Sequence, residues 1–221
     1  MGPVPLHSLA MDSVDLASLL CSRLCHDLMS PVGALNNGIE LLADEQDPDM
    51  RDRCMDLLTE SARVTANKLK FFRLAFGAAG GFGDAVATKE ARTALEGLLG
   101  GDRKVELNWM VADENLSKGA TKLLLNLSLI AIDALVRGGR LDIGVETDGS
   151  VEIAIRAEGP RIALDDAIRE TLLKGGESAV EARTAGAWLA HSLAAEAGGE
   201  IQLNRSSDEV LVIGAALPGH S

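Results

Sequence analysis

Aromatic and basic residues are scarce in this sequence. Its 221 residues include four Phe, two Trp and no Tyr, and 33 acidic residues outnumber 21 basic ones, which gives a net charge of −12. Proteins that bind DNA or RNA use clusters of Lys and Arg for the phosphates and aromatic side chains for stacking on bases. The composition therefore argues against a nucleic-acid partner, whereas a hydrophobic content of 47% is enough for a folded core.

Long apolar runs are missing as well. The most apolar stretch, residues 123–136, is interrupted by Asn126, Ser128 and Asp133, whereas a membrane-spanning helix needs about 20 consecutive apolar residues. The first residues also lack the basic and apolar regions of a secretory signal peptide. We therefore expect a cytoplasmic protein that does not insert into a membrane.

Cysteine is rare, and its spacing does not fit a disulfide framework. Three cysteines are present, and two of them, Cys21 and Cys25, lie one helical turn apart beside His26. A zinc site at this position would need a fourth ligand, which the surrounding sequence does not supply. We therefore expect reduced, buried thiols, typical of a cytoplasmic protein, and no metal bound by this chain.

Two long amphipathic helices are predicted over residues 12–76, after a loose tail at residues 1–11. The apolar residues of the first helix fall on one stripe, namely Leu16, Leu20, Leu24, Leu28, Leu35, Ile39 and Leu42. Asp47 and Pro48 then have the arrangement of a helix N-cap followed by a first-turn proline. The second helix is expected to end near Phe76 and to bury Met50, Cys54, Leu57, Leu58, Val64, Leu69 and Phe72.

A hairpin of two such helices cannot cover both of their apolar faces. A second copy of the chain would complete a four-helix bundle, which is the simplest arrangement that buries these faces. We therefore expect the protein to form a homodimer through residues 12–76.

A glycine-rich stretch at residues 77–83 marks the expected boundary to a second domain at residues 84–218. Strands are expected at 104–111, 141–146, 151–156, 201–204 and 210–216, and helices at 88–99, 116–137, 164–173 and 179–197. Asp148 and Gly149 are typical of a hairpin turn between two of the strands. Helices on one face of a mostly antiparallel sheet give an α+β sandwich as the fold class of this domain.

One histidine of the first helix faces away from the leucine stripe. On a helical wheel His26 lies about 170° from the centre of the stripe, which predicts exposure to solvent. A neutral imidazole nitrogen can attack phosphorus and carry a phosphoryl group, and the neighbouring Asp27 can orient the ring or take its proton. Ser30 adds a hydroxyl near the same surface, and Pro31 bends the helix just beyond it. The alternative is an ordinary surface histidine without a function.

Residues 26–31, His-Asp-Leu-Met-Ser-Pro, resemble the H-box of sensor histidine kinases, in which the histidine is phosphorylated. The resemblance continues along most of the chain. The helical hairpin is similar to the dimerisation and histidine-phosphotransfer domain of these kinases, and residues 84–218 are similar to their ATP-binding α/β sandwich. Residues 126–134 resemble the N-box, and residues 198–201 and 217–218 match the late part of the pattern.

Three nucleotide contacts of that family are missing here. Ile130 stands where the kinases have a magnesium-binding Asn, and Ala157 stands where they have an adenine-binding Asp, in a loop that ends with Arg161 in place of a glycine. Gly186 alone remains of the three glycines of the phosphate-side box. An intact phosphoacceptor motif joined to a degenerate ATP-binding domain resembles the ChpT-type histidine phosphotransferases of bacterial phosphorelays, which residues 26–42 match closely.

This resemblance implies a phosphotransferase that is not an ATP-dependent kinase. His26 would take a phosphoryl group from the receiver domain of a hybrid histidine kinase and pass it to the receiver domains of response regulators. Asp27 would be its catalytic partner, and Arg23, Ser30 and Pro31 would support the transfer surface. No cofactor is expected on this chain, because Mg²⁺ would come from the receiver partner.

Two alternatives stay open at this point. The first is a divergent but active sensor-type histidine kinase, and the second is a non-catalytic adaptor or inhibitor that binds kinases or receivers. The lysines near the end of the second helix leave a further choice. Lys68 and Lys70 either contact an acidic receiver or complement the negative end of the helix dipole.

Overall fold

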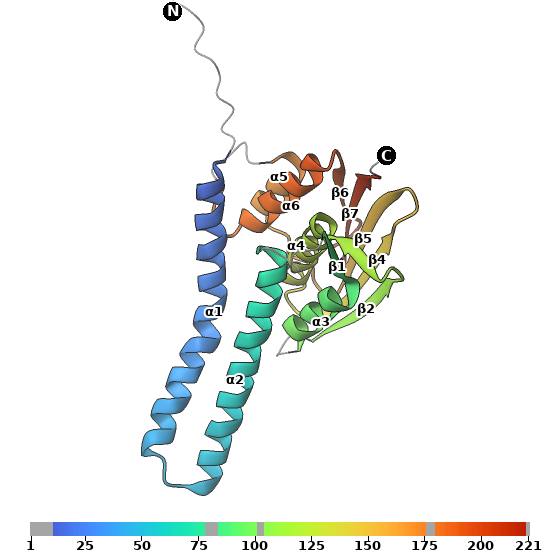
Figure 1. Ribbon diagram of the computed structural model, residues 1–221. Helices are drawn as coiled ribbons and strands as arrows, with labels where there is room; N and C mark the ends of the chain where they lie inside the picture. Colours follow the sequence, from blue (N-terminus) through green and yellow to red (C-terminus); the bar gives the residue numbers. More distant parts are fainter. Residues whose placement is uncertain (1–10, 78–83, 101–103, 176–179, 220–221) are drawn as a thin grey trace, which may run out of the picture.

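A computed structural model describes residues 11–77, 84–100, 104–175 and 180–219. Two long helices form a hairpin that stands beside an α/β domain and extends beyond it (Figure 1). The tail expected at residues 1–11 lies outside the described residues except for Met11, and the glycine-rich stretch at 77–83 lies outside them except for Gly77.

The hairpin consists of α1 (Ser13–Asp44) and α2 (Pro48–Ala75). The side chain of Asp47 accepts hydrogen bonds from the main-chain nitrogens at positions 49 and 50, and Pro48 is the first helical residue, so the predicted helix start is confirmed. Pro31 lies inside α1 and does not end the helix. Figure 1 shows α1 changing direction near its middle, in accord with the bend expected from a proline.

The second domain contains one five-stranded sheet. Its strands are β2 (Val105–Val111), β4 (Gly139–Glu146), β5 (Ser150–Glu158), β7 (Val210–Pro218) and β6 (Glu200–Arg205), in that spatial order. All neighbours pair antiparallel except β2 and β4, which are parallel. The turn between β4 and β5 has Gly149 at a φ of +75°, a conformation that favours glycine. The predicted hairpin turn and the mostly antiparallel sheet are confirmed.

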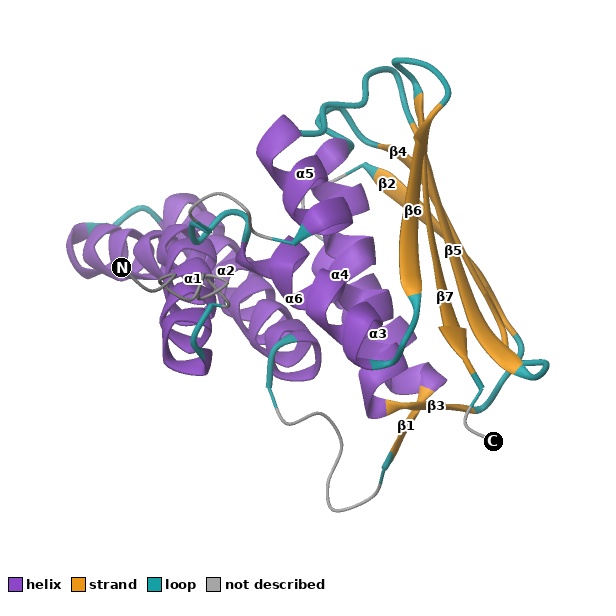
Figure 2. Cartoon of the chain, turned by 90° about the horizontal axis from the view of Figure 1, so that it is seen from above, coloured by secondary structure: helices purple, strands orange, loops and turns teal. Residues whose placement is uncertain are grey.

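Four helices cover one face of this sheet (Figure 2). They are α3 (Thr88–Leu99), α4 (Lys118–Ala134), α5 (Asp166–Lys174) and α6 (Ala185–Glu196). The expected α+β class is thus confirmed, but α4 and α6 are shorter than the helices predicted at 116–137 and 179–197, and α5 begins two residues later than predicted. Before α4, residues 115–117 form β3 (Asn115–Ser117), which pairs with β1 (Ala85–Ala87). Before α6, the Thr184 hydroxyl accepts a hydrogen bond from the main-chain nitrogen of Glu181 and donates one to the carbonyl oxygen of the same residue. These two hydrogen bonds close a turn.

The end of α2 belongs to the core of the second domain. Phe71, Phe72, Leu74 and Ala75 are all buried in the same hydrophobic cluster as the residues of α4 and the sheet. The rings of Phe71 and Phe72 meet edge to face at 5.6 Å between centroids. The hairpin therefore packs directly on the second domain, which the prediction of two domains joined by a glycine-rich stretch did not include.

Several side chains that the sequence predicted to be buried are exposed in the single chain. Two of the seven positions expected to be buried in α2 are buried, and two are half-buried. The other three, Met50, Leu57 and Leu69, are 43%, 43% and 46% exposed. Cys21 and Cys25 are also exposed, so the expectation of buried thiols is wrong for both. The described residues of α1 and α2 contact each other and one side of the second domain, which leaves the remaining faces of the hairpin uncovered.

Among the described residues, no helix is long and apolar enough to cross a membrane.

Candidate functional site

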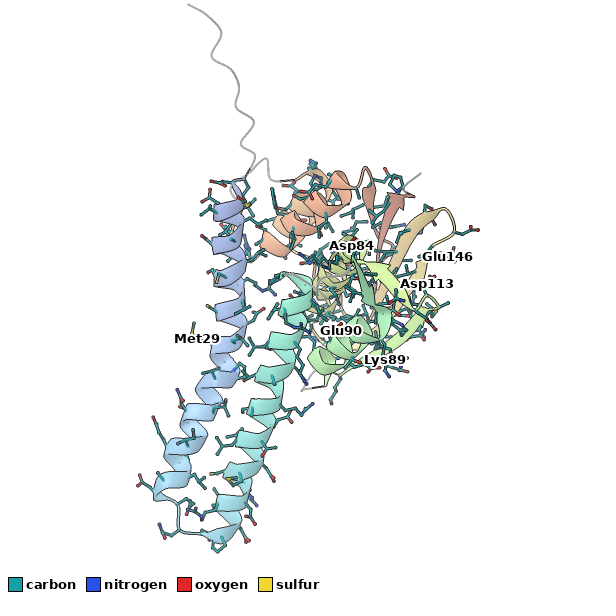
Figure 3. All side chains as sticks on the ribbon, viewed as in Figure 1. Met29, Asp84, Lys89, Glu90, Asp113 and Glu146 are labelled. Carbon is teal, nitrogen blue, oxygen red and sulfur yellow. The ribbon has the colours of Figure 1, made fainter. Side chains whose placement is uncertain are left out.

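His26 projects from α1 into solvent. Its side chain is 82% exposed, as the helical wheel predicts for a residue opposite the leucine stripe. Met29, three residues further along α1, is 69% exposed and projects away from the second domain (Figure 3). A partner protein can therefore reach the His26 ring without any movement of the second domain.

Asp27 holds one nitrogen of the His26 ring. Its Oδ1 lies 3.2 Å from Nδ1 of His26, and its side chain is only 19% exposed. Within the described part of the chain, the other ring nitrogen, Nε2, makes no hydrogen bond. A carboxylate at Nδ1 favours the neutral tautomer with its proton on Nδ1, and this tautomer leaves the Nε2 lone pair free for an incoming electrophile.

Arg23 holds the second oxygen of the same carboxylate. Its Nε donates to Oδ2 of Asp27 at 2.8 Å, and its Nη2 donates to Oδ2 of Asp133 in α4 at 2.8 Å. Burial alone would lower the pKa of Arg23, but hydrogen bonds and charge attraction from both carboxylates outweigh it and raise the pKa above its ordinary value. Arg23 is therefore a fixed positive charge that connects α1 to the second domain.

Lys68 reaches the main chain at the same point of α1. Its Nζ donates to the carbonyl oxygen of Asp27 at 2.7 Å. In a regular helix this oxygen would accept from the nitrogen of residue 31, but Pro31 has no amide hydrogen. Lys68 thus replaces the missing helical hydrogen bond, which neither of the two interpretations drawn from the sequence anticipated.

The remaining predicted site residues have different surroundings. Ser30 is exposed, and its hydroxyl makes no hydrogen bond to the described residues, whereas Pro31 is buried. The structure thus places Asp27 in contact with both His26 and Arg23 and leaves Ser30 one turn away on the surface. In the described ranges, no group of three or more His, Cys, Asp and Glu side chains is arranged to hold a metal ion.

The positions that would hold a nucleotide in a kinase are closed or apolar. Ile130 and Ala157 are both buried in the hydrophobic core. Asn126 donates from Nδ2 to the carbonyl of Ala75 at the end of α2, so the first N-box residue attaches the hairpin to α4. A Cβ on Gly186 would lie 3.4 Å from Oδ1 of Asn126. Ile130 presents no magnesium ligand, and Ala157 presents no acceptor for the adenine amino group, so these two positions do not fit Mg-ATP.

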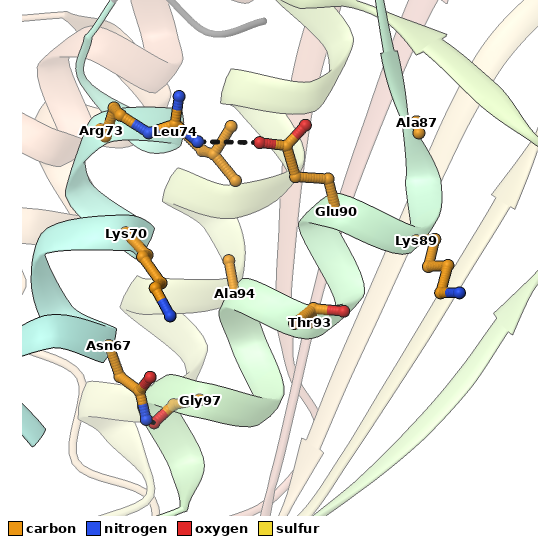
Figure 4. A pocket seen from close by; sticks show the side chains of 10 residues that line it. All are labelled: Asn67, Lys70, Arg73, Leu74, Ala87, Lys89, Glu90, Thr93, Ala94 and Gly97. Carbon is orange, nitrogen blue, oxygen red and sulfur yellow. Dashed lines mark hydrogen bonds and ion pairs between the residues drawn. The ribbon is translucent and has the colours of Figure 1, made fainter. Parts of the chain in front are cut away.

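A separate cavity of about 380 Å³ lies between α2 and α3 (Figure 4). Leu74 and Ala94 contribute apolar lining, and Lys70 projects toward it. Arg73 and Glu90 form an ion pair of 2.9 Å on its rim. None of His26, Asp27, Arg23, Ser30 and Pro31 lines this cavity, so it is distinct from the surface around His26.

The chain is similar to known histidine phosphotransferases. The family described as "Histidine phosphotransferase C-terminal domain" matches residues 88–209. The protein phosphotransferase ChpT of Brucella abortus (strain 2308) is 36% identical over 204 residues, which are 91% of this chain and 95% of that protein. A solved structure described as a bacterial phosphotransferase is 33% identical, with a TM-score of 0.82 over 94% of this chain and 98% of that one. This chain therefore belongs to the ChpT-type histidine phosphotransferases.

Proposed function

We propose that this protein is a phosphorelay phosphotransferase that carries a phosphoryl group on Nε2 of His26 between receiver-domain aspartates. One observation carries the proposal. The imidazole is exposed to a partner, and Asp27 engages it at Nδ1 only, which leaves Nε2 as the nucleophile. The partners are the receiver domains of a hybrid histidine kinase and of response regulators, and the compartment is the cytoplasm.

In the first step, Nε2 of His26 attacks the phosphorus of a phospho-aspartate on the upstream receiver. The new N–P bond forms while the P–O bond to the aspartate breaks, and the bonding electron pair leaves with the aspartate carboxylate. The ring keeps its Nδ1 proton and gains a positive charge, which the Asp27 carboxylate faces. A carboxylate oxygen of the downstream receiver then attacks the same phosphorus, and the electron pair of the N–P bond returns to Nε2.

This chain supplies the nucleophile and its orientation, and the receiver supplies the metal. Mg²⁺ is held by the acidic pocket of the receiver, so phosphoryl transfer needs no cofactor on this protein. The buried side chains of Ile130 and Ala157 support a reaction without ATP, because neither can bind a metal or an adenine. Incubation with labelled ATP and Mg²⁺ is expected to leave His26 unlabelled, and labelling would favour the divergent kinase instead.

The protein forms a homodimer in which the hairpins of two chains pair. In the single chain, Ile39 is 57% exposed and Leu57 is 43% exposed. Both belong to the apolar pattern of the two long helices, and pairing with a second hairpin would bury them in a four-helix bundle. The two His26 side chains of such a dimer remain accessible, because His26 lies on the opposite side of α1 from the leucine stripe.

The test is transfer of labelled phosphate from a phosphorylated receiver domain to a second receiver, with wild-type protein beside His26→Ala. Wild type is expected to carry the label, and His26→Ala is expected to carry none. His191→Ala is the matched control, because the hydrogen bond that the structure gives the His191 ring joins Nδ1 to the carbonyl oxygen of Leu172 and involves none of the residues around His26. Full transfer by His26→Ala would contradict the proposal and would favour the adaptor.

A further inference from the structure

A continuous series of contacts joins the second domain to the ring of His26. Oδ2 of Asp133 accepts from Nη2 of Arg23, Nε of Arg23 donates to Oδ2 of Asp27, and Oδ1 of Asp27 lies at Nδ1 of His26. The successive distances are 2.8, 2.8 and 3.2 Å. We call these four residues the contact relay. Its first member belongs to α4 and its other three to α1.

The relay determines the orientation of the Asp27 carboxylate. A carboxylate that is bound at only one oxygen can rotate, and it then holds a histidine ring poorly. Arg23 binds the second oxygen of Asp27, and the flat guanidinium is itself fixed because Asp133 takes another of its nitrogens. Asp133 is 32% exposed, Arg23 and Asp27 are each 19% exposed, and His26 is 82% exposed. The two middle members of the relay are thus the most enclosed, and the nucleophile is its most exposed member.

The relay also balances charge beside the ring. The positive charge of Arg23 lies beside the Asp27 carboxylate. Without Asp133, Arg23 would make Asp27 a weaker acceptor for the Nδ1 proton. Asp133 shares the positive charge of Arg23, so the Asp27 carboxylate keeps enough negative charge to hold that proton. Both effects act on the same property of His26, which is the fraction of the ring with its proton on Nδ1 and its lone pair on Nε2.

We propose that Asp133 is a positioning residue for phosphoryl transfer, acting on His26 through Arg23 and Asp27. This inference rests on the proposed function of His26. It gives the degenerate ATP-binding domain a direct part in the reaction, because one of its own carboxylates fixes the geometry of the phosphoacceptor.

Attachment of the two domains does not account for this ion pair. The buried side chains of Phe71, Phe72 and Leu74 already join α2 to the second domain, and Asn126 binds the end of α2. A partly exposed ion pair adds little to stability beside such a core. A contact with no role in positioning would therefore leave the chemistry of His26 unchanged when it is removed.

The test uses phosphoramidate as phosphoryl donor, so that receiver docking does not enter the rate. The step forms the Nε2–P bond, breaks the P–N bond of the protonated donor and releases ammonia. Full-length Asp133→Asn is expected to phosphorylate about tenfold more slowly than wild type, in the range that misplacement of a reacting group causes. Asp133→Glu is expected to recover most of the rate. The double variant Arg23→Gln/Asp133→Asn is expected to be no slower than Arg23→Gln, because the proposed effect of Asp133 on His26 passes through Arg23.

A second readout separates positioning from a general loss of structure. In ¹⁵N NMR spectra, the His26 ring of wild type is expected to be mainly the Nδ1–H tautomer, and that of Asp133→Asn a mixture of both tautomers. Arg73→Gln is the matched control, because it removes an ion pair between α2 and α3 that does not touch the relay. It is expected to leave both readouts unchanged.

The possible failures are distinguishable. A wild-type rate and tautomer in Asp133→Asn would overturn the positioning role while leaving the role of His26 intact. The positioning role would also be overturned if the phosphorylation rate of Arg23→Gln/Asp133→Asn fell by the product of the two single-variant effects. Phosphorylation of His26→Ala at the wild-type rate would instead remove the proposed function on which the inference rests.

Discussion

Lys68 supplies the hydrogen bond that Pro31 removes from the helix that carries His26. Nζ of Lys68 donates at 2.7 Å to the carbonyl oxygen of Asp27, a residue 41 positions earlier in the chain. This carbonyl is the one that a residue with an amide hydrogen at position 31 would have engaged. The bend beside the phosphoacceptor is thus stabilised by the neighbouring helix, and α1 and α2 are coupled within one residue of His26.

The first prediction concerns the stability of this arrangement. Lys68→Met keeps most of the apolar stem but leaves the Asp27 carbonyl without a partner, so the free energy of unfolding is expected to fall by about 1–2 kcal/mol. Urea denaturation followed by circular dichroism measures the change. Lys70→Met is the matched control, because Lys70 lies two residues further along α2, is exposed and has no hydrogen bond or ion pair among the described residues.

The same prediction has a sharper form in the Pro31→Ala background. Alanine restores an amide hydrogen at position 31, and the Asp27 carbonyl can then accept the usual helical hydrogen bond. Lys68→Met is expected to lower the free energy of unfolding less than half as much in Pro31→Ala as in the wild type. A double-mutant cycle measures this difference. Equal costs in the two backgrounds would show that Lys68 does not compensate for the proline.

The second prediction concerns the oligomeric state. Ile39→Asp introduces a carboxylate on the apolar side of α1 that the proposed dimer buries, and the cost of desolvating this charge is expected to separate the copies. Sedimentation velocity at micromolar concentration is expected to give the mass of two chains for wild type and of one chain for the variant.

Leu41→Asp provides the control for this experiment. Leu41 is 59% exposed, as accessible as Ile39, but residues two positions apart lie on nearly opposite sides of a helix. Leu41→Asp is therefore expected to remain dimeric. A monomeric wild type, or a dimeric Ile39→Asp, would be incompatible with the proposed bundle.

Local signals in the sequence were sufficient for most of the fold. The apolar periodicity and the Asp47 cap predicted the hairpin, and alternation around Gly149 predicted two central strands, because these signals act over a few residues. The three-residue strands β1 and β3 were missed, since so short a segment has no measurable alternation. The ends of α4 and α6 were missed for a related reason. Tertiary contacts and turns, such as the one closed by Thr184, ended helices whose composition would have allowed them to continue.

The candidate site was predictable only where its residues are close in sequence. The exposure of His26 followed from helical geometry, and Arg23 lies one turn before Asp27, where an ion pair is expected. Asp133 is 110 positions from Arg23, and no pattern connects the two. One feature of the sequence indicates a contact such as that of Lys68. A proline inside a helical pattern implies a carbonyl oxygen that needs another hydrogen-bond donor. Identifying that donor required the packing of α2 against α1.

The third prediction concerns the closed nucleotide region. Ala157 is fully buried in β5, where it pairs with Leu141 and Leu211 on the neighbouring strands. Ala157→Asp restores the residue type that kinases have at this position, but it buries a charge in an apolar core. We expect the free energy of unfolding to fall by about 3 kcal/mol or more, with no gain of ATP binding.

Ala154→Asp is the matched control for this variant. Ala154 lies on the same strand but is exposed, so its substitution is expected to change the stability by less than about 0.5 kcal/mol. Chemical denaturation measures stability, and titration with a fluorescent ATP analogue measures binding. A stable Ala157→Asp variant that binds the analogue would show that the region is an open nucleotide site.

The fourth prediction concerns acid stability and depends on Asp142 in β4. Burial alone would raise the pKa of Asp142, but hydrogen bonds from Asn108, Arg140 and Arg156 and the positive charge of Arg140 outweigh it, so its pKa lies below the ordinary value. A carboxylate whose pKa is lower in the folded state than in the unfolded state stabilises the protein above the unfolded pKa of about 3.9. That contribution is lost as the pH falls through the folded pKa.

Asp142→Asn is therefore expected to lower the stability at pH 7 and to reduce the further loss of stability between about pH 5 and pH 2, because the variant has no proton to bind at this position. Urea unfolding at a series of pH values measures both effects. Asp208→Asn is the comparison, since Asp208 is 92% exposed in its ion pair with Arg205 and is expected to leave the pH profile close to that of wild type. An Asp142→Asn profile parallel to that of wild type would mean that the three donors around this carboxylate do not contribute to acid stability.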